Sequence, residues 1–146
     1  MFFDFLDWLD EVYFPLSHQR LSDHKNLVVD RLAKIGIPVH PANSGLFVIV
    51  DLRKFLTDNT ADAERALLGK LSDRGVFLRP GLGLHFDEPG FFRLVFSVRR
   101  PSLLEALRRI EKFLSEDWNP NTLRNSGTNK LFDSATTPIA LSILSN

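Results

Sequence analysis

Cysteine is absent from this 146-residue sequence, which excludes disulfides, thiolate chemistry and Cys-type zinc sites. A net charge is absent as well, because 18 Lys and Arg residues balance 18 Asp and Glu residues. Without a cationic excess, the composition favours neither nucleic acid nor an anionic membrane as a partner. The longest purely apolar run, 46–50, is far shorter than the ~18 residues that a membrane span needs.

A secretory leader is not indicated, since the apolar first residues are interrupted by Asp4 and Asp7 and have no basic start. We therefore expect a cytoplasmic location. Tyrosine is scarce, with one residue against 13 phenylalanines. Aromatic residues crowd the N-terminal segment 1–16, which is expected to form an apolar helix that Pro15 ends. Such a segment should dock on this domain or on a partner.

The patterns that are present predict an α/β fold, a small layer of three or more strands with helices on one face. Apolar residues with helical spacing predict helices at 19–35, 61–74 and 102–114. Apolar runs rich in β-branched and aromatic residues predict strands at 46–52, 76–79 and 91–98. The last two strands are joined by a glycine-punctuated loop and should be antiparallel.

Local signals predict how two of these helices begin. Asn59 or Thr60 is expected to cap the helix 61–74, and Ser102 with Glu105 is expected to form a capping box. The composition also divides the chain into an apolar N-terminal segment, 1–16, a domain, 17–117, and a segment rich in Asn, Ser and Thr, 118–146. We interpret 118–146 as an extended or disordered tail.

Arg93 is the main candidate for a functional residue, because it stands in the middle of the apolar strand Phe91-Phe92-Arg93-Leu94-Val95-Phe96. A permanently charged side chain there is costly unless an anion meets it. That anion is either an internal carboxylate or part of a ligand. A guanidinium on a rigid strand is well suited to hold a carboxylate with two hydrogen bonds. Spacing alone favours the internal ion pair.

Weaker candidates surround the central strand. Asn43-Ser44-Gly45 precedes it and is either a plain turn or a place where a side-chain amide meets a ligand. Asp51 at the strand end is expected to cap the next turn or to pair with Arg53. The four histidines show no metal-ligand spacing, so no metal site is predicted.

Three separated motifs resemble the C-terminal small domain of class I/II aminotransferases, which are fold-type I enzymes that use pyridoxal phosphate. They are Asn43-Ser44-Gly45-Leu46-Phe47-Val48-Ile49-Val50-Asp51, then Gly75-Val76-Phe77-Leu78-Arg79-Pro80-Gly81, then Glu88-Pro89-Gly90-Phe91-Phe92-Arg93. The last motif is most similar to the 1-aminocyclopropane-1-carboxylate synthase-like branch. The resemblance covers about residues 17–115 in the family's order and spacing.

The resemblance implies roles for individual residues. The family's arginine at the position of Arg93 holds the substrate α-carboxylate. The segment that matches 43–45 lies near the substrate entrance, so Asn43 and Gly45 join Arg93 as candidate substrate-binding residues. Helices like 19–35 connect the small domain to the large one. The resemblance assigns no role to Arg79.

The sequence departs from the family because the large domain with its cofactor-binding residues does not appear in it. Pyridoxal phosphate chemistry needs a Schiff-base lysine and an acid beside the ring nitrogen. The family's Ser-x-Ser-Lys type of motif matches none of Lys25, Lys34, Lys54, Lys70, Lys112 and Lys130. We therefore name no catalytic residue and expect that this chain alone does not bind pyridoxal phosphate.

Two functional hypotheses follow. The first is a truncated or split enzyme of the family, inactive alone, which needs a large-domain chain or a homodimer partner. The second is a non-catalytic regulatory module that binds an amino acid or another carboxylate. The sequence leaves open whether the chain is itself an enzyme.

Overall fold

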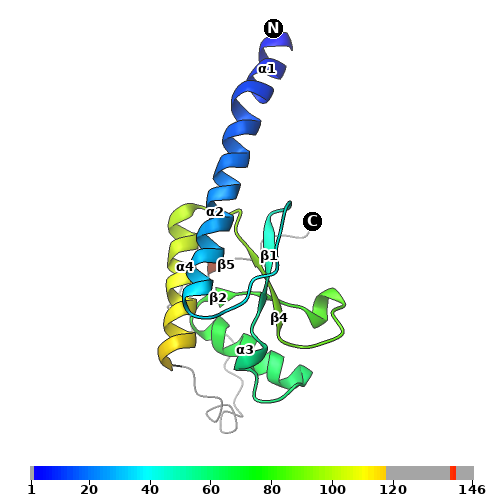
Figure 1. Cartoon of the computed structure of the whole chain (residues 1–146), viewed down its shortest axis with the longest axis vertical. Coiled ribbons are helices and arrows are strands. Elements are labelled where there is room, and N and C mark those ends of the chain that lie inside the picture. The colour runs from blue at the N-terminus through cyan, green and yellow to red at the C-terminus, as the bar shows by residue number, and fades with distance from the viewer. Residues whose placement is uncertain (1, 118–138, 141–146) are drawn as a thin grey trace.

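A small antiparallel sheet with helices packed on one face forms the centre of the structure (Figure 1). The computed structural model describes residues 2–117 and 139–140. Its central strands are β1 (Phe47–Asp51), β3 (Arg79–Pro80) and β4 (Phe91–Val95), in the order β1-β4-β3. This arrangement confirms the small α/β layer that the sequence predicts.

The register of β1 against β4 decides which side chains enter the core. Val48 lies opposite Leu94 and Val50 opposite Phe92, and all four are buried. Because side chains alternate across a strand, the residues between them point to the other face, which is only partly covered. Pairing of β3 with β4 is antiparallel, as expected.

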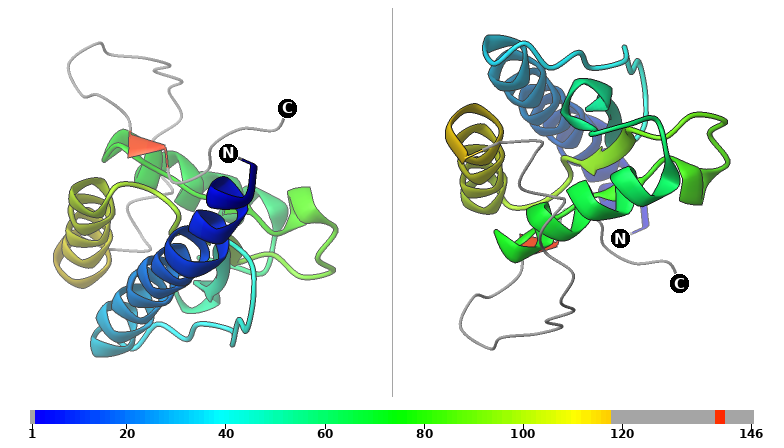
Figure 2. Two further views of the ribbon diagram at one scale, coloured as in Figure 1. Left: turned by 90° about the horizontal axis from the view of Figure 1, so that it is seen from above. Right: turned by 90° about the horizontal axis from the view of Figure 1, so that it is seen from below.

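Three helices contribute much of the remaining core: α2 (Phe14–Lys34), α3 (Ala61–Asp73) and α4 (Arg100–Lys112). Helices α2 and α4 lie side by side (Figure 2), and Arg31 of α2 forms an ion pair with Glu111 near the end of α4. Shorter helical turns occur at Arg53–Phe55, Leu82–Leu84 and Phe113–Asp117.

The expected cap of α3 is confirmed at Thr60, whose Oγ1 accepts a hydrogen bond from the N–H of Ala63 at 3.2 Å.

The capping box expected at the start of α4 is wrong. Arg99 is the N-cap residue and makes no side-chain cap bond, so Ser102 already lies inside the helix. Pro101 favours this earlier start, because a proline in the first turn sacrifices no helical hydrogen bond. Glu105 instead accepts hydrogen bonds from Arg108 and Arg109, which lower its pKa to about 2.

The N-terminal segment is helical, but Pro15 does not end it. Helix α1 (Phe2–Trp8) runs through a π-helical turn, Leu9–Tyr13, directly into α2 (Figure 1). Pro15 sits in the first turn of α2, where the N–H of Phe14 reaches back to the carbonyl of Leu9. Wider π-helical bonding of this kind accommodates a residue that cannot donate an N–H.

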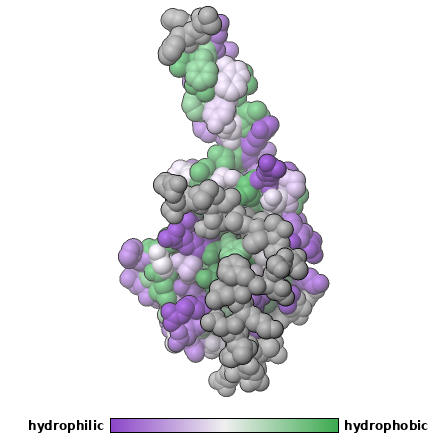
Figure 3. Space-filling model, turned by 180° about the vertical axis from the view of Figure 1, so that it is seen from behind, coloured by the Kyte–Doolittle hydropathy of each residue, from purple (hydrophilic) through white to green (hydrophobic). Residues whose placement is uncertain are grey.

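This N-terminal helix protrudes from the body instead of docking on it. Figure 3 shows apolar and aromatic side chains along the protruding part. Phe5, Trp8, Tyr13 and Phe14 are between 42% and 58% exposed and contact mainly one another, with ring centroids 5.5–6.3 Å apart. We name this stretch, residues 5–16, the aromatic helix surface. No helix of the described residues is long and apolar enough to cross a membrane.

The strand expected at 76–79 is divided between two sheets. β2 (Val76–Phe77) pairs in parallel with β5 (Ile139–Ala140), whereas Arg79 and Pro80 join the central sheet. β5 falls within the segment 118–146 that was interpreted as a tail. The remainder of that segment lies outside the described residues.

The turn before β4 is held by a buried carboxylate. Glu64 of α3 is 2% exposed and accepts a hydrogen bond from the N–H of Gly90 at 2.6 Å. Gly90 has a φ of +98°, and a Cβ there would lie 2.6 Å from Cγ of Arg53. The start of β4 therefore depends on a residue without a side chain.

We expect Gly90→Ala to lower the free energy of unfolding by about 2–4 kcal/mol, because it combines a strained φ with a steric overlap. Urea unfolding monitored by circular dichroism measures this effect. Gly69→Ala is the matched control, since Gly69 lies in α3 with nothing within 4 Å of an added Cβ. That variant should gain about 0.5–1 kcal/mol. Equal effects of the two substitutions would contradict the account of Gly90.

Candidate carboxylate-binding site

Arg93 lies on the partly covered face of the sheet, in the middle of a row that crosses all three strands. Ile49 of β1 is its partner on one side and Arg79 of β3 on the other. Its guanidinium stands 5.2 Å from the ring centroid of Phe47, a cation–π arrangement. Its Nε is buried and has no hydrogen-bond partner among the residues that the structure describes. The strand and the ring together hold the charged group in place.

An internal ion pair does not explain Arg93 among the side chains that the structure describes. Arg93 forms no ion pair with any of them. The nearby carboxylates belong to Arg53 instead, with Asp51 at 2.7 Å and Glu88 at 3.2 Å. A buried guanidinium nitrogen without a partner is costly, and the N–H at Nε of Arg93 could donate a hydrogen bond to an anion.

Asp51 takes both of the roles expected of it. Its Oδ1 accepts a hydrogen bond from the N–H of Arg53 at 3.0 Å, and its Oδ2 accepts one from Nη2 of Arg53 at 2.7 Å. The hydrogen bond from the Arg53 side chain is the main reason why the pKa of Asp51 lies below its ordinary value. Arg53 therefore stays charged and paired at neutral pH.

Aromatic rings line the same face beside Arg93. Phe91 is the centre of this group, with the guanidinium of Arg53 at 4.6 Å and the rings of His40 and Phe86 each at 5.5 Å from its centroid. Aromatic rings exclude water and lower the local dielectric, which strengthens a charge-assisted hydrogen bond to Arg93.

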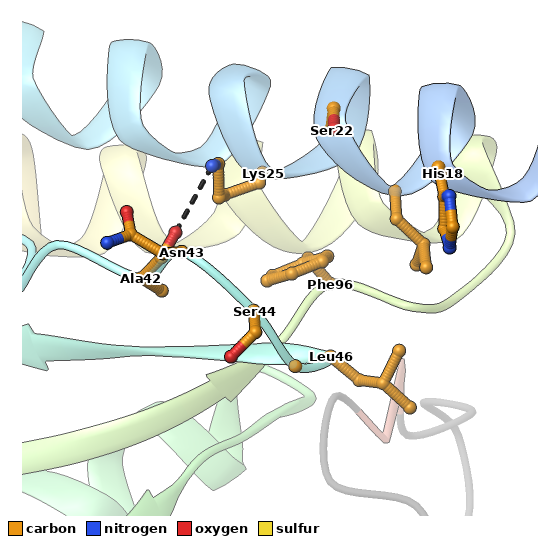
Figure 4. A pocket seen from close by; sticks show the side chains of 10 residues that line it. His18, Ser22, Lys25, Ala42, Asn43, Ser44, Leu46 and Phe96 are labelled. Atoms are coloured by element: carbon orange, nitrogen blue, oxygen red, sulfur yellow. Dashed lines mark hydrogen bonds between the residues drawn. The ribbon is translucent and has the colours of Figure 1, made fainter. Parts of the chain in front are cut away.

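Asn43 and Gly45 lie at a different place, a cleft of about 450 Å³ between α2 and the segment before β1 (Figure 4). His18, Ser22 and Lys25 face this cleft from α2. Lys25 Nζ donates a hydrogen bond to the carbonyl oxygen of Ala42 at 3.2 Å, which ties the segment to the helix.

The structure therefore does not bring the three candidate residues into one pocket. Arg93 is not among the residues that line the cleft, whereas Phe96, whose side chain is buried in the helix-covered core, is. Leu46 lines the cleft, and the next residue, Phe47, lies under the guanidinium of Arg93. The roles of Asn43 and Gly45 stay predictions.

Sequence reasoning missed the position of Arg79. Its Cα is the direct partner of Arg93 across the β3–β4 ladder, which places both side chains on one face. Strand alternation alone does not reveal a cross-strand partner.

Among the described residues, no group of three or more His, Cys, Asp or Glu side chains could hold a metal ion.

The fold has counterparts among solved aminotransferases. Aspartate aminotransferase from Thermotoga maritima superposes with a TM-score of 0.54 at 32% identity, over 66% of this chain and 23% of that one. An aminotransferase from Mycobacterium tuberculosis superposes with a TM-score of 0.58 at 29% identity, over 66% of this chain and 24% of that one. Fold and sequence together thus define this chain as aminotransferase-like.

The family follows from the sequence match. Residues 9–110 match the family model described as aminotransferase class I and II, so the chain belongs to that family. The human 1-aminocyclopropane-1-carboxylate synthase-like protein 1 is 36% identical over 109 residues, 75% of this chain and 22% of the relative. The Arabidopsis thaliana 1-aminocyclopropane-1-carboxylate synthase 11 is 36% identical over 107 residues, 72% and 23% respectively. The chain thus spans about a fifth of the length of these curated relatives.

The Asp51–Arg53 pair predicts a pH-dependent contribution to stability. Because the folded-state pKa of Asp51 is lowered, its contribution is present above the ordinary carboxyl pKa and is lost as the pH falls through the folded value. Asp51→Asn should cost up to about 1 kcal/mol at pH 7, since Arg53 is half exposed and solvent screens the pair.

Urea unfolding of both proteins from pH 7 down to pH 2 measures this difference, which should shrink below about pH 4. Asp23→Asn is the control, because Asp23 is exposed on α2 and forms no ion pair with the described residues. A difference that stays constant down to pH 2 would contradict the role of Asp51.

Proposed function

We propose that this chain supplies the substrate-carboxylate half of a pyridoxal-phosphate enzyme site of the 1-aminocyclopropane-1-carboxylate synthase-like group. Arg93 binds the α-carboxylate of the substrate. The observation that carries this proposal is the Nε of Arg93, on the face of the sheet that the helices do not cover, which is buried and has no partner among the described side chains. The match to the aminotransferase class I and II family supports this proposal.

The physical setting of Arg93 suits a carboxylate. Its backbone is held between β1 and β3, and Phe47 lies under the guanidinium, so little side-chain freedom is lost when an anion binds. A charge-assisted hydrogen bond in such a place contributes about 1.5–3 kcal/mol. Asn43 and Gly45, in the cleft beside α2, are proposed to line the path by which the substrate enters.

The residues beside Arg93 do not form a cofactor site by themselves. Pyridoxal phosphate needs a lysine amine and an acid at its ring nitrogen. The row that crosses the sheet at Arg93 offers Ile49 and Arg79, and the adjacent acid, Asp51, is bonded to Arg53. We therefore propose that pyridoxal phosphate is held by a large domain of the aminotransferase type and not by this small domain.

The aromatic helix surface supports such an assembly. Its exposed rings contact mainly one another, and water-exposed apolar surface of this extent is typical of a surface that another protein covers. The helix that carries it continues into the core helix α2, so a partner bound there would be rigidly connected to the sheet. We propose that the large domain covers this surface.

Arg93→Gln tests the carboxylate site. We expect the affinity for L-alanine and for propionate to fall at least about tenfold, because the charge-assisted bonds are lost. Backbone amide shifts of β1 and β4 during NMR titration measure the affinity. Arg65→Gln is the matched control, since Arg65 is exposed on α3 and pairs only with Asp62 among the described residues. Unchanged affinity in Arg93→Gln would overturn the proposed function.

A second candidate function is a non-catalytic module that binds an amino acid or another carboxylate. Two observations favour it: Arg93, Phe47 and the flanking strands all come from this one chain, and a human relative that is 34% identical over 110 residues carries the name "Probable inactive 1-aminocyclopropane-1-carboxylate synthase-like protein 2". Such a module would regulate a partner according to the ligand bound.

Borohydride reduction in the presence of pyridoxal phosphate tests whether the chain is inactive alone. We expect no stoichiometric adduct on a single lysine, because Lys25 and Lys54 are engaged with backbone carbonyls and the family's lysine motif is not found in the sequence. Mass spectrometry of the digested protein identifies any adduct. A stoichiometric adduct at one lysine would contradict both the proposal that the cofactor is held outside this small domain and the non-catalytic binding module.

A further inference from the structure

Arg79 and Arg93 form a pair of like charges that nothing in the described part of the chain neutralises. Their Cα atoms are direct partners in the antiparallel ladder of β3 and β4. In such pairs the Cβ atoms lie about 4.5–5.5 Å apart and the side chains share one face. Neither guanidinium forms an ion pair with a described side chain. Like charges directly opposite one another destabilise a sheet, so the arrangement has a cost.

Arg53 differs from these two arginines, because the carboxylates of Asp51 and Glu88 already form ion pairs with it. Arg53 lies against Phe91, close to the same face, and has two acidic partners, Asp51 and Glu88. Arg53, at the edge, is therefore paired with acids, whereas Arg79 and Arg93 of the central row have no acidic partner among the described residues. Two cations side by side match a ligand with two anionic groups.

We propose that Arg79 is a second anion-binding residue, which makes this chain selective for dicarboxylates. The α-carboxylate of an acidic amino acid binds Arg93, and the carboxylate of its side chain binds Arg79. This inference rests on the proposed function, since it requires that Arg93 hold the first carboxylate. Arg79 is exposed and Arg93 is half-buried, so the distal acid meets the more accessible arginine.

The geometry of the row supports a ligand that lies across the strands. Ile49, Arg93 and Arg79 follow one another at the same level of the sheet, and Phe47 lies under the guanidinium of Arg93. A four-carbon dicarboxylate carries its two carboxylates a few ångströms apart, which is the scale of a cross-strand pair. A monocarboxylate brings only one negative charge to the two arginines, so part of their repulsion remains.

The test compares succinate, L-aspartate, propionate and inorganic phosphate as ligands of the full chain, by NMR titration of the arginine Nε–H signals. We expect succinate and L-aspartate to bind at least about tenfold more tightly than propionate. Arg79→Gln should remove that preference while lowering the affinity for propionate only slightly. Arg79→Lys, which retains the charge, should keep part of the preference.

The outcomes separate the two proposals. If Arg79→Gln leaves the preference for succinate intact, or if the wild-type chain binds phosphate as tightly as succinate, the dicarboxylate inference is overturned and the proposed function stands. If Arg93→Gln leaves propionate binding intact, the proposed function itself fails. Arg20→Gln, at an exposed position of α2, is the control for the loss of one positive charge. It should change the affinity for neither succinate nor propionate.

Discussion

The antiparallel pairing of β1 with β4 is the contact on which the rest of the structure depends. Its register places Val48, Val50, Phe92 and Leu94 in the core, beneath the helices. Because side chains alternate, the same register sends Arg93 to the opposite face. A slip of one residue would bury a guanidinium among leucines and phenylalanines, so hydrophobic burial of one face dictates the position of the charge on the other.

Charge on that face is distributed unevenly. The acids near the ends of the strands pair with Arg53, while the central row carries Arg93 and Arg79, with the ring of Phe47 against Arg93. A folded domain seldom keeps a buried guanidinium nitrogen without a partner, since the uncompensated desolvation is costly. The chain belongs to the aminotransferase family, and the guanidinium of Arg93 is suited to bind an anion that comes from outside the domain.

Much of the fold was predictable from local patterns. The continuous apolar run around Val48, the helical spacing in 61–74 and the cap at Thr60 each depend on residues close together in the sequence. The failures also have local causes. Pro15 was expected to end a helix, but a π-helical turn accommodates it, and Pro101 moved the start of α4 ahead of the expected capping box. Both prolines lie in first turns, where they cost little.

The sequence by itself determined the family resemblance, the central strand and the presence of an arginine in an apolar run, because these follow from residue type and short-range periodicity. Only the tertiary structure decided what surrounds that arginine. The separation of Arg93 from the cleft at Asn43, the commitment of Asp51 to Arg53 and the position of Arg79 opposite Arg93 all arise from contacts between distant segments. Strand register is set by burial of the whole core, so these neighbours exist only once the chain has folded.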